Sequence, residues 1–487
     1  MSESSNTEET YRLELQAYVD QERAAVDLIN TIGKLIFDKS IELVLFRNHL
    51  VDSKITEIMR LHKYAAEVVE KPISIFDTAE LAREIYEMDL APAKIDIGKL
   101  SNEWINEADR FKTKKAFLED KLHNFMMADS SPLEPRDVVL YGFGRIGRLA
   151  ARELITQAGK GQQLRLRAIV TRGVDTKTLI KRAALLENDS IHGRFSGTIE
   201  VDAENKDLIV NGQRVHMIDA ADPAQIDYNS YGINNALLID NTGILRDEEA
   251  LSKHLQSKGI SKVILTAPGK GIPNIVYGIN HRDLDIANQN IFSAASCTTN
   301  AICPVLHVIE NSLGIEKGHI ETVHAYTNDQ NLLDNMHKKS RRGRSAAINM
   351  VITETGAGSA VTKVIPELKD KLTANAVRVP TPNGSLAIIN VYVKRRTTKE
   401  EVNALLKKAA LEGELVNQIY YSINEELVSN DIIGNECCSV CDSPATIVSN
   451  DGKGIVLYVW YDNEFGYTKQ VLRLAKYVAK VRRNIYY

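Results

Sequence analysis

The sequence lacks the features that indicate export, membrane insertion or nucleic-acid binding. Five cysteines in 487 residues are too few for a disulfide framework and fit a reducing compartment with free thiols. The first residues, Met1–Asn6, have neither the basic nor the apolar region of a signal peptide. No apolar run approaches the ~20 residues that span a membrane, and a net charge of −4 gives no general attraction to nucleic acid. We therefore expect a cytoplasmic protein that binds neither membranes nor nucleic acid.

The length predicts several domains. A single hydrophobic core stops growing near ~250–300 residues, so 487 residues predict two or three domains. Hydrophobic residues make up 44% of the chain and charged residues 25%, which is the composition of an ordinary globular protein.

The first 130 residues have a helical pattern. Only two prolines precede residue 131, and apolar residues recur at intervals of three and four. The best series predicts one long amphipathic helix from Leu100 to Phe125, with Asp96 or Ser101 as its cap. Asp77 resembles the cap of an earlier helix. Residues 1–130 are thus predicted to be an α-helical extension, packed on itself or on a partner subunit.

A change of pattern follows a linker rich in serine and proline, Ser130–Pro135. Short buried strands then alternate with helices, as in Val138–Tyr141, Ala236–Asp240 and Lys262–Leu265. This alternation predicts an α/β fold with a doubly wound parallel sheet over residues 136–296.

Longer alternating runs occur later in the chain. They are Ile320–Tyr326, Leu386–Val393 and Ile455–Tyr461, and they predict a mixed or antiparallel sheet. We expect an α+β catalytic domain over residues 297–462, and a C-terminal helix within 463–487 that returns to the first sheet.

A glycine-rich turn joins the first of these strands to a helix. It reads Gly142-Phe143-Gly144-Arg145-Ile146-Gly147 and matches G-x-G-x-x-G. A strand before the motif and a helix after it are the context that a dinucleotide site needs, because the helix N-terminus then faces the pyrophosphate. The segment predicts that NAD or NADP binds here.

The end of the next strand bears on the choice of cofactor. NAD-specific folds tend to place a carboxylate there, whereas this chain has Thr171 followed by Arg172. An arginine could pair with the 2′-phosphate of NADP. Alternatively, Arg172 points to solvent and Asp175 takes the acidic role.

Cys297 is the best candidate for a nucleophile. The thiolate attacks, and an unperturbed thiol with a pKa near ~8.5 needs a helix N-terminus or an imidazole to ionise. Ser-Cys-Thr-Thr-Asn followed by an apolar run predicts a helix that begins near Cys297. His324, at the end of a predicted strand, is the candidate base, although a strand histidine taken alone is more often structural.

The chain resembles the glyceraldehyde-3-phosphate dehydrogenase family from about Val138 to its C-terminus. The matching segments occur in family order: Tyr141–Arg148, Asp189–Phe195, Asn241–Gly243, Ser293–Asn300, Arg378–Asn383 and Trp460–Tyr467. The first ~130 residues lie outside the resemblance.

The resemblance implies a mechanism. Cys297 attacks the aldehyde and forms a thiohemiacetal, with His324 as the base and the Cys297 backbone N–H at the oxyanion. Transfer of hydride leaves a thioester, which inorganic phosphate attacks. Asn463 is expected to bind the nicotinamide carboxamide, and Thr242 is expected at the cofactor.

The resemblance also implies two phosphate sites. Thr327 and Arg378 fit the phosphate of the aldehyde. Ser296, Thr298, Thr355 and Gly356 fit the attacking phosphate. A homotetramer without a metal ion is expected.

Some residues depart from the commonest glycolytic pattern. Asp329 replaces a threonine near the expected substrate phosphate, as in erythrose-4-phosphate dehydrogenases. Leu332–Asp334, His337 and Arg341–Arg344 resemble photosynthetic and anabolic NADP-using members. The basic run Lys338–Arg344 is short, so we interpret it as a solvated or inter-subunit loop.

The cysteines Cys437, Cys438 and Cys441 lack the spacing of a zinc site and are interpreted as buried small residues, as is Cys303.

Three functions remain open at this point. The first is phosphorylating oxidation of glyceraldehyde 3-phosphate, in glycolysis or gluconeogenesis. The second is oxidation of erythrose 4-phosphate. The third is a regulatory or scaffold protein that uses the helical extension on an enzyme fold.

Overall fold

The computed structural model divides the chain into two compact units. Residues 1–133 form the first unit together with 482–487, and residues 134–481 form the second. The structure describes residues 2–126, 134–159, 163–219 and 222–487. Over these ranges no helix combines the length and the apolar character needed to cross a membrane. The predicted linker at Ser130–Pro135 lies largely outside the described residues.

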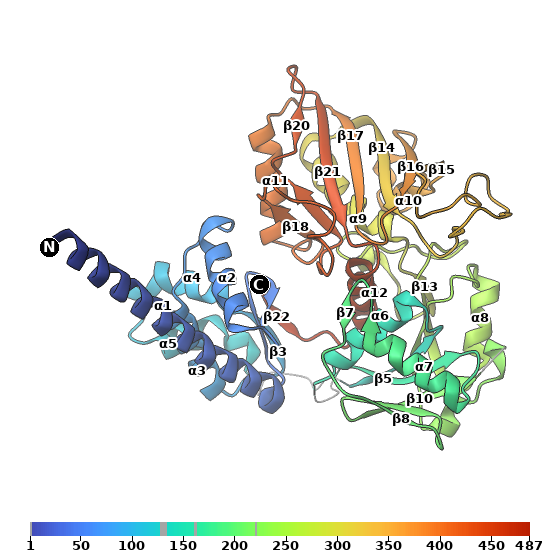
Figure 1. Cartoon of the computed structure of the whole chain (residues 1–487), viewed down its shortest axis with the longest axis horizontal. Coiled ribbons are helices and arrows are strands. Elements are labelled where there is room, and N and C mark those ends of the chain that lie inside the picture. The colour runs from blue at the N-terminus through green and yellow to red at the C-terminus, as the bar shows by residue number, and fades with distance from the viewer. Residues whose placement is uncertain (1, 127–133, 160–162, 220–221) are drawn as a thin grey trace. The chain divides into compact units, whose positions relative to one another are not determined.

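The first unit combines helices with a small sheet (Figure 1). The long helix α1 packs against α2 and α3. The sheet has the order β2-β1-β3-β22, and its last strand comes from the C-terminus. The helices are α1 (Ser2–Lys34), α2 (Ile55–Glu67), α3 (Ile75–Glu87), α4 (Ile97–Glu107) and α5 (Lys114–Lys121). The strands are β1 (Glu42–Leu45), β2 (Asn48–His49), β3 (Ala93–Asp96) and β22 (Asn484–Tyr486).

The predicted long helix between residues 100 and 125 is wrong. It is broken into α4 and α5, because Thr113 caps α5 by accepting a hydrogen bond from the backbone N–H of Ala116 at 3.1 Å. Asp96 caps α4 as predicted and accepts from the N–H of Lys99 at 3.0 Å.

The cap of α3 also differs from the prediction. Ser74 accepts from the N–H of Phe76 at 3.2 Å, so the helix begins at Ile75 and Asp77 lies in its first turn. The sheet was not predicted, because its strands have four residues or fewer.

The second unit begins with the predicted doubly wound sheet. Its order is β13-β12-β11-β4-β5-β10-β9-β8, and the strands from β13 to β10 are parallel. Both faces are buried: Val138 and Leu140 belong to one core cluster, and Val139 between them belongs to the other. The parallel strands are β4 (Arg136–Tyr141), β5 (Leu164–Thr171), β10 (Gln213–Asp219), β11 (Ala236–Asp240), β12 (Ile260–Leu265) and β13 (Ile291–Ser293). The antiparallel strands are β8 (Ile199–Asp202) and β9 (Asp207–Val210), and the helices are α6 (Arg145–Thr156), α7 (Thr176–Glu187) and α8 (Glu248–Gln256).

A second sheet of mixed direction follows, with the order β15-β16-β14-β17-β21-β19-β18. Helices α9 and α11 pack beside it (Figure 1). Its strands are β14 (Ile315–Ala325), β15 (Val351–Thr353), β16 (Leu372–Val379), β17 (Ser385–Val393), β18 (Ile419–Ser422), β19 (Ser439–Asp442) and β21 (Gly454–Tyr461). The helices are α9 (Cys297–Leu313), α10 (Ala357–Val364) and α11 (Lys399–Leu411).

The last helix, α12 (Phe465–Val478), returns to the first sheet and packs on α6. Val471 and Ala475 of α12 share a core cluster with Val138 of β4. The predicted C-terminal segment 463–487 is therefore helical only as far as Val478. Its last part, Asn484–Tyr486, belongs to the first unit and pairs with β3.

Candidate functional site

The glycine-rich turn between β4 and α6 has the geometry that a dinucleotide needs. Gly142 has a φ of 95°, which side chains disfavour. A Cβ on Gly147 would lie 2.3 Å from the carbonyl oxygen of Gly142, so only glycine lets the helix approach the turn. A Cβ on Gly144, by contrast, would meet no atom within 4 Å. The middle glycine therefore borders open space at the N-terminus of α6, where a pyrophosphate fits.

The end of β5 carries no carboxylate aimed at this turn. Arg172 is exposed, and its carbonyl accepts from the guanidinium of Arg182. Asp175 caps α7 and accepts from the N–H of Thr178 at 3.1 Å. Asp219, which the sequence did not single out, accepts from the N–H of Gly173 at 3.0 Å and is the carboxylate that holds this loop.

Cys297 is the first residue of α9, as predicted. Ser296 caps the helix and accepts from the N–H of Thr299 at 3.0 Å. Ala295 just before it has a φ of 55°, a strained conformation for alanine, and its carbonyl accepts from the Tyr467 hydroxyl at 2.9 Å. The strained turn and the helix N-terminus together fix the position of the thiol.

His324 lies opposite the thiol at the end of β14. Its Nε2 is 3.6 Å from the Sγ of Cys297. The parallel register of β14 and β16 places Arg378 beside it, and the Arg378 Nη1 lies 2.6 Å from His324 Nδ1 and 2.7 Å from the Ala325 carbonyl oxygen. His324 Nδ1 also lies 2.7 Å from the Ala325 carbonyl oxygen, and because a carbonyl only accepts, this contact places the imidazole proton on Nδ1 and leaves Nε2 as the acceptor that faces the sulfur.

Both reacting groups are uncharged at neutral pH in this arrangement. Burial and the nearby charge of Arg378 lower the pKa of His324 to about 3. Burial raises the pKa of the Cys297 thiol, and Arg378 only partly offsets that effect. The Cys297 thiol therefore keeps its proton until a further charge in the site changes the pKa of the thiol or of His324.

A cavity of about 920 Å³ brings eight of the predicted site residues together. Among its lining residues are Gly144, Arg145, Ile146, Ser296, Cys297, His324, Thr327 and Asn463. The turn predicted for the dinucleotide and the predicted nucleophile thus share one cavity.

The other predicted residues lie behind this lining or away from it. Thr298 binds the Tyr461 hydroxyl at 3.1 Å. Thr242 donates to Asp240 at 2.6 Å. Gly356 precedes α10, and Thr355 accepts from the N–H of Ala357. The residues that do not line the cavity are Gly142, Phe143, Gly147, Thr171, Arg172, Thr242, Thr298, Thr355, Gly356 and Arg378.

Asn463 is held by a serine that the sequence did not reveal. The Ser385 hydroxyl donates to Asn463 Oδ1 at 2.8 Å and accepts from the N–H of Ala325 at 3.1 Å. The amide oxygen is therefore occupied, and the Nδ2 of Asn463 is the group left to donate into the cavity. A serine at the start of a strand gave no sequence signal.

Asp329 lies at the predicted substrate phosphate site. It accepts a short hydrogen bond from the Thr327 hydroxyl and pairs closely with Arg342. Burial raises the pKa of Asp329, but these two partners outweigh it and keep the pKa below its usual value. Arg342 is 8% exposed, so this member of the basic run is buried rather than solvated.

The remaining cysteines lie away from the cavity. Cys303, Cys438 and Cys441 are buried as predicted, whereas Cys437 is partly exposed, contrary to the prediction. Across the parts of the chain that the structure describes, no three histidine, cysteine or acidic side chains gather as a metal site would require.

Comparisons with known proteins agree with this geometry. The NAD binding domain of glyceraldehyde 3-phosphate dehydrogenase matches residues 136–248, and its C-terminal domain matches residues 296–463. A glyceraldehyde-3-phosphate dehydrogenase-like protein of Pseudomonas aeruginosa is 48% identical over 93% of this chain and 98% of its own length. That match is too long to be confined to the second unit.

Shorter relatives match about the length of the second unit. The glyceraldehyde-3-phosphate dehydrogenase of Zymomonas mobilis is 41% identical over 70% of this chain and 98% of its own length. Glyceraldehyde-3-phosphate dehydrogenase 1 of Bacillus subtilis is 40% identical over the same shares. The predicted fold class and dinucleotide-binding domain are confirmed, and the chain belongs to the glyceraldehyde-3-phosphate dehydrogenase family of oxidoreductases.

Proposed function

We propose that this protein catalyses the reversible, phosphorylating oxidation of glyceraldehyde 3-phosphate to 1,3-bisphosphoglycerate with NAD or NADP. The observation that carries the proposal is the pairing of Cys297 Sγ with His324 Nε2 at 3.6 Å, in the cavity that also holds Gly144 and Asn463. A nucleophile, a base and a dinucleotide turn in one cavity are what this reaction needs.

Cys297 attacks the aldehyde carbon while His324 Nε2 takes the thiol proton and passes it to the aldehyde oxygen, which gives a thiohemiacetal. The first N–H groups of α9 have no partner within the helix and stabilise the developing oxyanion. His324 then accepts the hydroxyl proton, and the carbon becomes a thioester. The turn around Gly144 and Asn463 would hold NAD(P), which would supply the hydride acceptor when bound.

Arg378 and Thr327 bind the phosphate of the aldehyde in this proposal. The buried Nε of Arg378 has no hydrogen-bond partner among the residues described, and a phosphate oxygen would satisfy it. An anion there also offsets the positive charge that lowers the pKa of His324, so substrate binding favours proton uptake by the base. Ser296, Thr298, Thr355 and Gly356 are proposed for the attacking phosphate.

The test is phosphate-dependent formation of NADH or NADPH from glyceraldehyde 3-phosphate. We expect Cys297→Ser to abolish it and the wild-type enzyme to need phosphate for turnover. Retained activity in the variant would overturn the assignment. Steady-state rates with NAD and with NADP, measured side by side, decide which cofactor the protein prefers. The exposed Arg172 and the helix-capping Asp175 support NADP.

Erythrose 4-phosphate is the second candidate substrate. The observation that favours it is the Asp329 carboxylate on the Thr327 hydroxyl, where the commonest glycolytic pattern has a threonine. Turnover of the two aldehydes at equal concentration separates these candidates.

We also propose a homotetramer. The segment between β14 and β15 exposes large apolar side chains that a monomer would leave in water: Leu332 (71% exposed), Leu333 (75%), Met336 (92%), Ile348 (79%) and Met350 (73%). Light scattering measures the assembly directly. A regulatory or scaffold role of the first unit, and the cytoplasmic location, stay predictions.

A further inference from the structure

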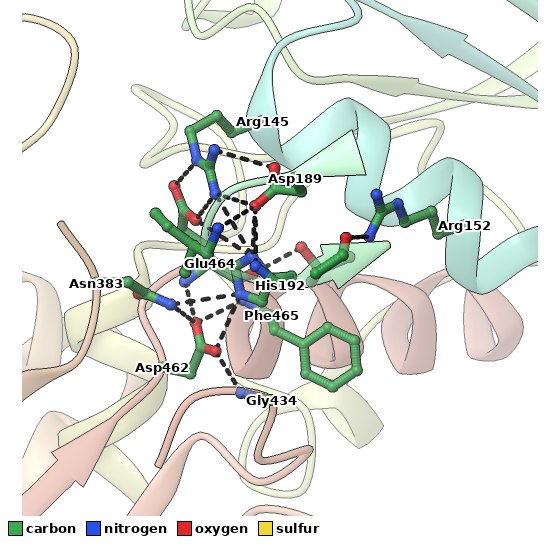
Figure 2. Close-up of polar contacts among 12 residues, drawn as sticks. Arg145, Arg152, Asp189, His192, Asn383, Gly434, Asp462, Glu464 and Phe465 are labelled. Carbon is green, nitrogen blue, oxygen red and sulfur yellow. Dashed lines mark hydrogen bonds and ion pairs between the residues drawn. The ribbon is translucent and has the colours of Figure 1, made fainter. Parts of the chain in front are cut away.

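A buried cluster of charges joins the two domains of the second unit beside the cofactor cavity. Figure 2 shows Arg145, Asp189 and His192 from the dinucleotide-binding side meeting Asp462 and Glu464 from the turn before α12. The side chains are 5% exposed at His192, 7% at Asp189, 0% at Asp462 and 12% at Glu464. Charges this well shielded from water require partners, so the geometry of the cluster is constrained.

The dinucleotide-binding side of the cluster is firmly held. Arg145 is the first residue of α6, directly after Gly144, and donates to Asp189 at 3.1 and 3.2 Å. The segment that carries Asp189 and His192 is tied to α6 by Arg152, which donates to the carbonyl oxygens of Leu186 and Gly193. The position of His192 is therefore set by the helix that begins at the cofactor turn.

The other side of the cluster is the turn that carries Asn463. Glu464, directly after it, accepts from Arg145, at 2.5 Å for Nη2. Asp462, directly before it, accepts five hydrogen bonds: from His192 Nε2 at 3.2 Å, from Asn383 Nδ2 at 2.9 Å, and from the N–H groups of Gly434, Glu464 and Phe465. Both sequence neighbours of Asn463, Asp462 and Glu464, thus accept hydrogen bonds from residues of the dinucleotide-binding side.

His192 decides the charge balance of the cluster. Its ring faces three carboxylates, Asp189, Asp462 and Glu464, with Arg145 as the other cation and Asn383 as a neutral neighbour. Burial lowers the pKa of His192, but the carboxylates outweigh it and raise the pKa above its ordinary value. The carboxylates therefore favour the imidazolium, and deprotonation of His192 would leave three buried anions against the one cation Arg145.

We propose that His192 is a positioning residue that fixes the Asp462–Glu464 turn and thereby sets Asn463 for the nicotinamide. This inference rests on the proposed function, because it assigns cofactor binding to Asn463. One network then ties the pyrophosphate end of the site, at Arg145, to the nicotinamide end. His192 itself is absent from the lining of the cavity, so it acts through the turn.

The experiment measures the affinity of NADH and NADPH by nicotinamide fluorescence, which needs no turnover. We expect His192→Ala to weaken binding about tenfold or more, since it removes a hydrogen-bonded charge from a buried cluster. In an Asn463→Ala background the same change is expected to have little further effect. Equal affinity in His192→Ala and wild type, or fully additive losses in the double variant, would overturn the proposal.

The pH dependence of cofactor affinity is a second measurement, and a simple loss of packing at residue 192 does not change it. Wild-type affinity is expected to fall as pH rises through the raised pKa of His192, because deprotonation removes the cation. His192→Gln keeps a donor for Asp462 without the charge, so its affinity is expected to lie between those of wild type and His192→Ala and to stay flat with pH. A pH profile in His192→Gln that matches wild type contradicts the proposal, and this variant serves if His192→Ala does not fold.

His216→Gln is the matched control. His216 also pairs with a carboxylate, Asp207 at 2.8 Å, but lies on β10 outside the cavity lining. It is expected to bind cofactor like wild type. Wild-type turnover of glyceraldehyde 3-phosphate separates the two proposals: its absence sinks the proposed function, whereas an active wild type with an unaffected His192→Ala sinks only this inference.

Discussion

Protonation of His324 is expected to limit the stability of the enzyme in acid. The pKa of this histidine falls from 6.5 to about 3 in the folded protein, whereas the unfolded chain keeps the ordinary value. Between these two pH values the unfolded state holds one more proton than the folded state. Stability is therefore unaffected above pH 6.5 and falls as pH drops through the window, by about 1.4 kcal/mol per pH unit. The largest total loss is roughly 5 kcal/mol, a substantial part of a typical folding free energy.

The assay compares wild type with His324→Gln, which cannot take up the proton. Thermal midpoints of both proteins are measured at intervals between pH 7.5 and 4.5. Wild type is expected to lose stability more steeply than the variant below pH 6.5, while the carboxylates that both proteins share cancel in the difference. Histidine ring resonances report the same event, with one imidazole remaining neutral at pH 5. Parallel stability curves, or a normal titration of His324 near 6.5, would falsify the reasoning.

Three further predictions follow from named contacts. Gly147→Ala places a Cβ 2.3 Å from a backbone oxygen and is expected to lower the thermal midpoint of unfolding. Gly144→Ala meets no such atom, so this variant is expected to fold normally but to bind the cofactor at least tenfold more weakly in a fluorescence titration. Ser385→Ala removes the donor to the Asn463 amide oxygen and is expected to raise the KM for the cofactor severalfold in steady-state assays, with an unchanged KM arguing against that hydrogen bond's role. Asp329→Thr removes a carboxylate from the proposed phosphate site and is expected to lower the KM for glyceraldehyde 3-phosphate more than that for erythrose 4-phosphate; equal changes would contradict the assigned specificity role.

The catalytic part of the fold could be predicted because its signals are local. The turn from Gly142 to Gly147 lies between a strand and a helix that a short window detects. The start of α9 at Cys297 is predicted by Ser-Cys-Thr-Thr-Asn followed by an apolar run. His324 became a candidate base only through the matching segments around it. Its partner Arg378 is set by the register of two strands 54 residues apart.

The rest depends on contacts that sequence periodicity does not reveal. The apolar spacing continues across the break between α4 and α5, where Phe117 and Leu118 are buried, so the spacing alone does not reveal that the helix ends. His192 and Asp462 are 270 residues apart, so nothing near either one indicates their contact. Short strands such as β1 and β3 are too brief to show alternation, and their sheet includes residues from the opposite end of the chain.

The strand β22 changes how the molecule must be built. Because Asn484–Tyr486 pair with β3, the N-terminal sheet stays incomplete until synthesis has reached residue 486. In the order of the chain, the second unit is an insertion within the first unit rather than an addition behind it. The ribosome thus completes the inner unit before the outer one. Removal of residues 484–487 would disturb the N-terminal sheet, more than 380 residues away in sequence, where Lys99 donates to the carbonyl oxygen of Tyr487.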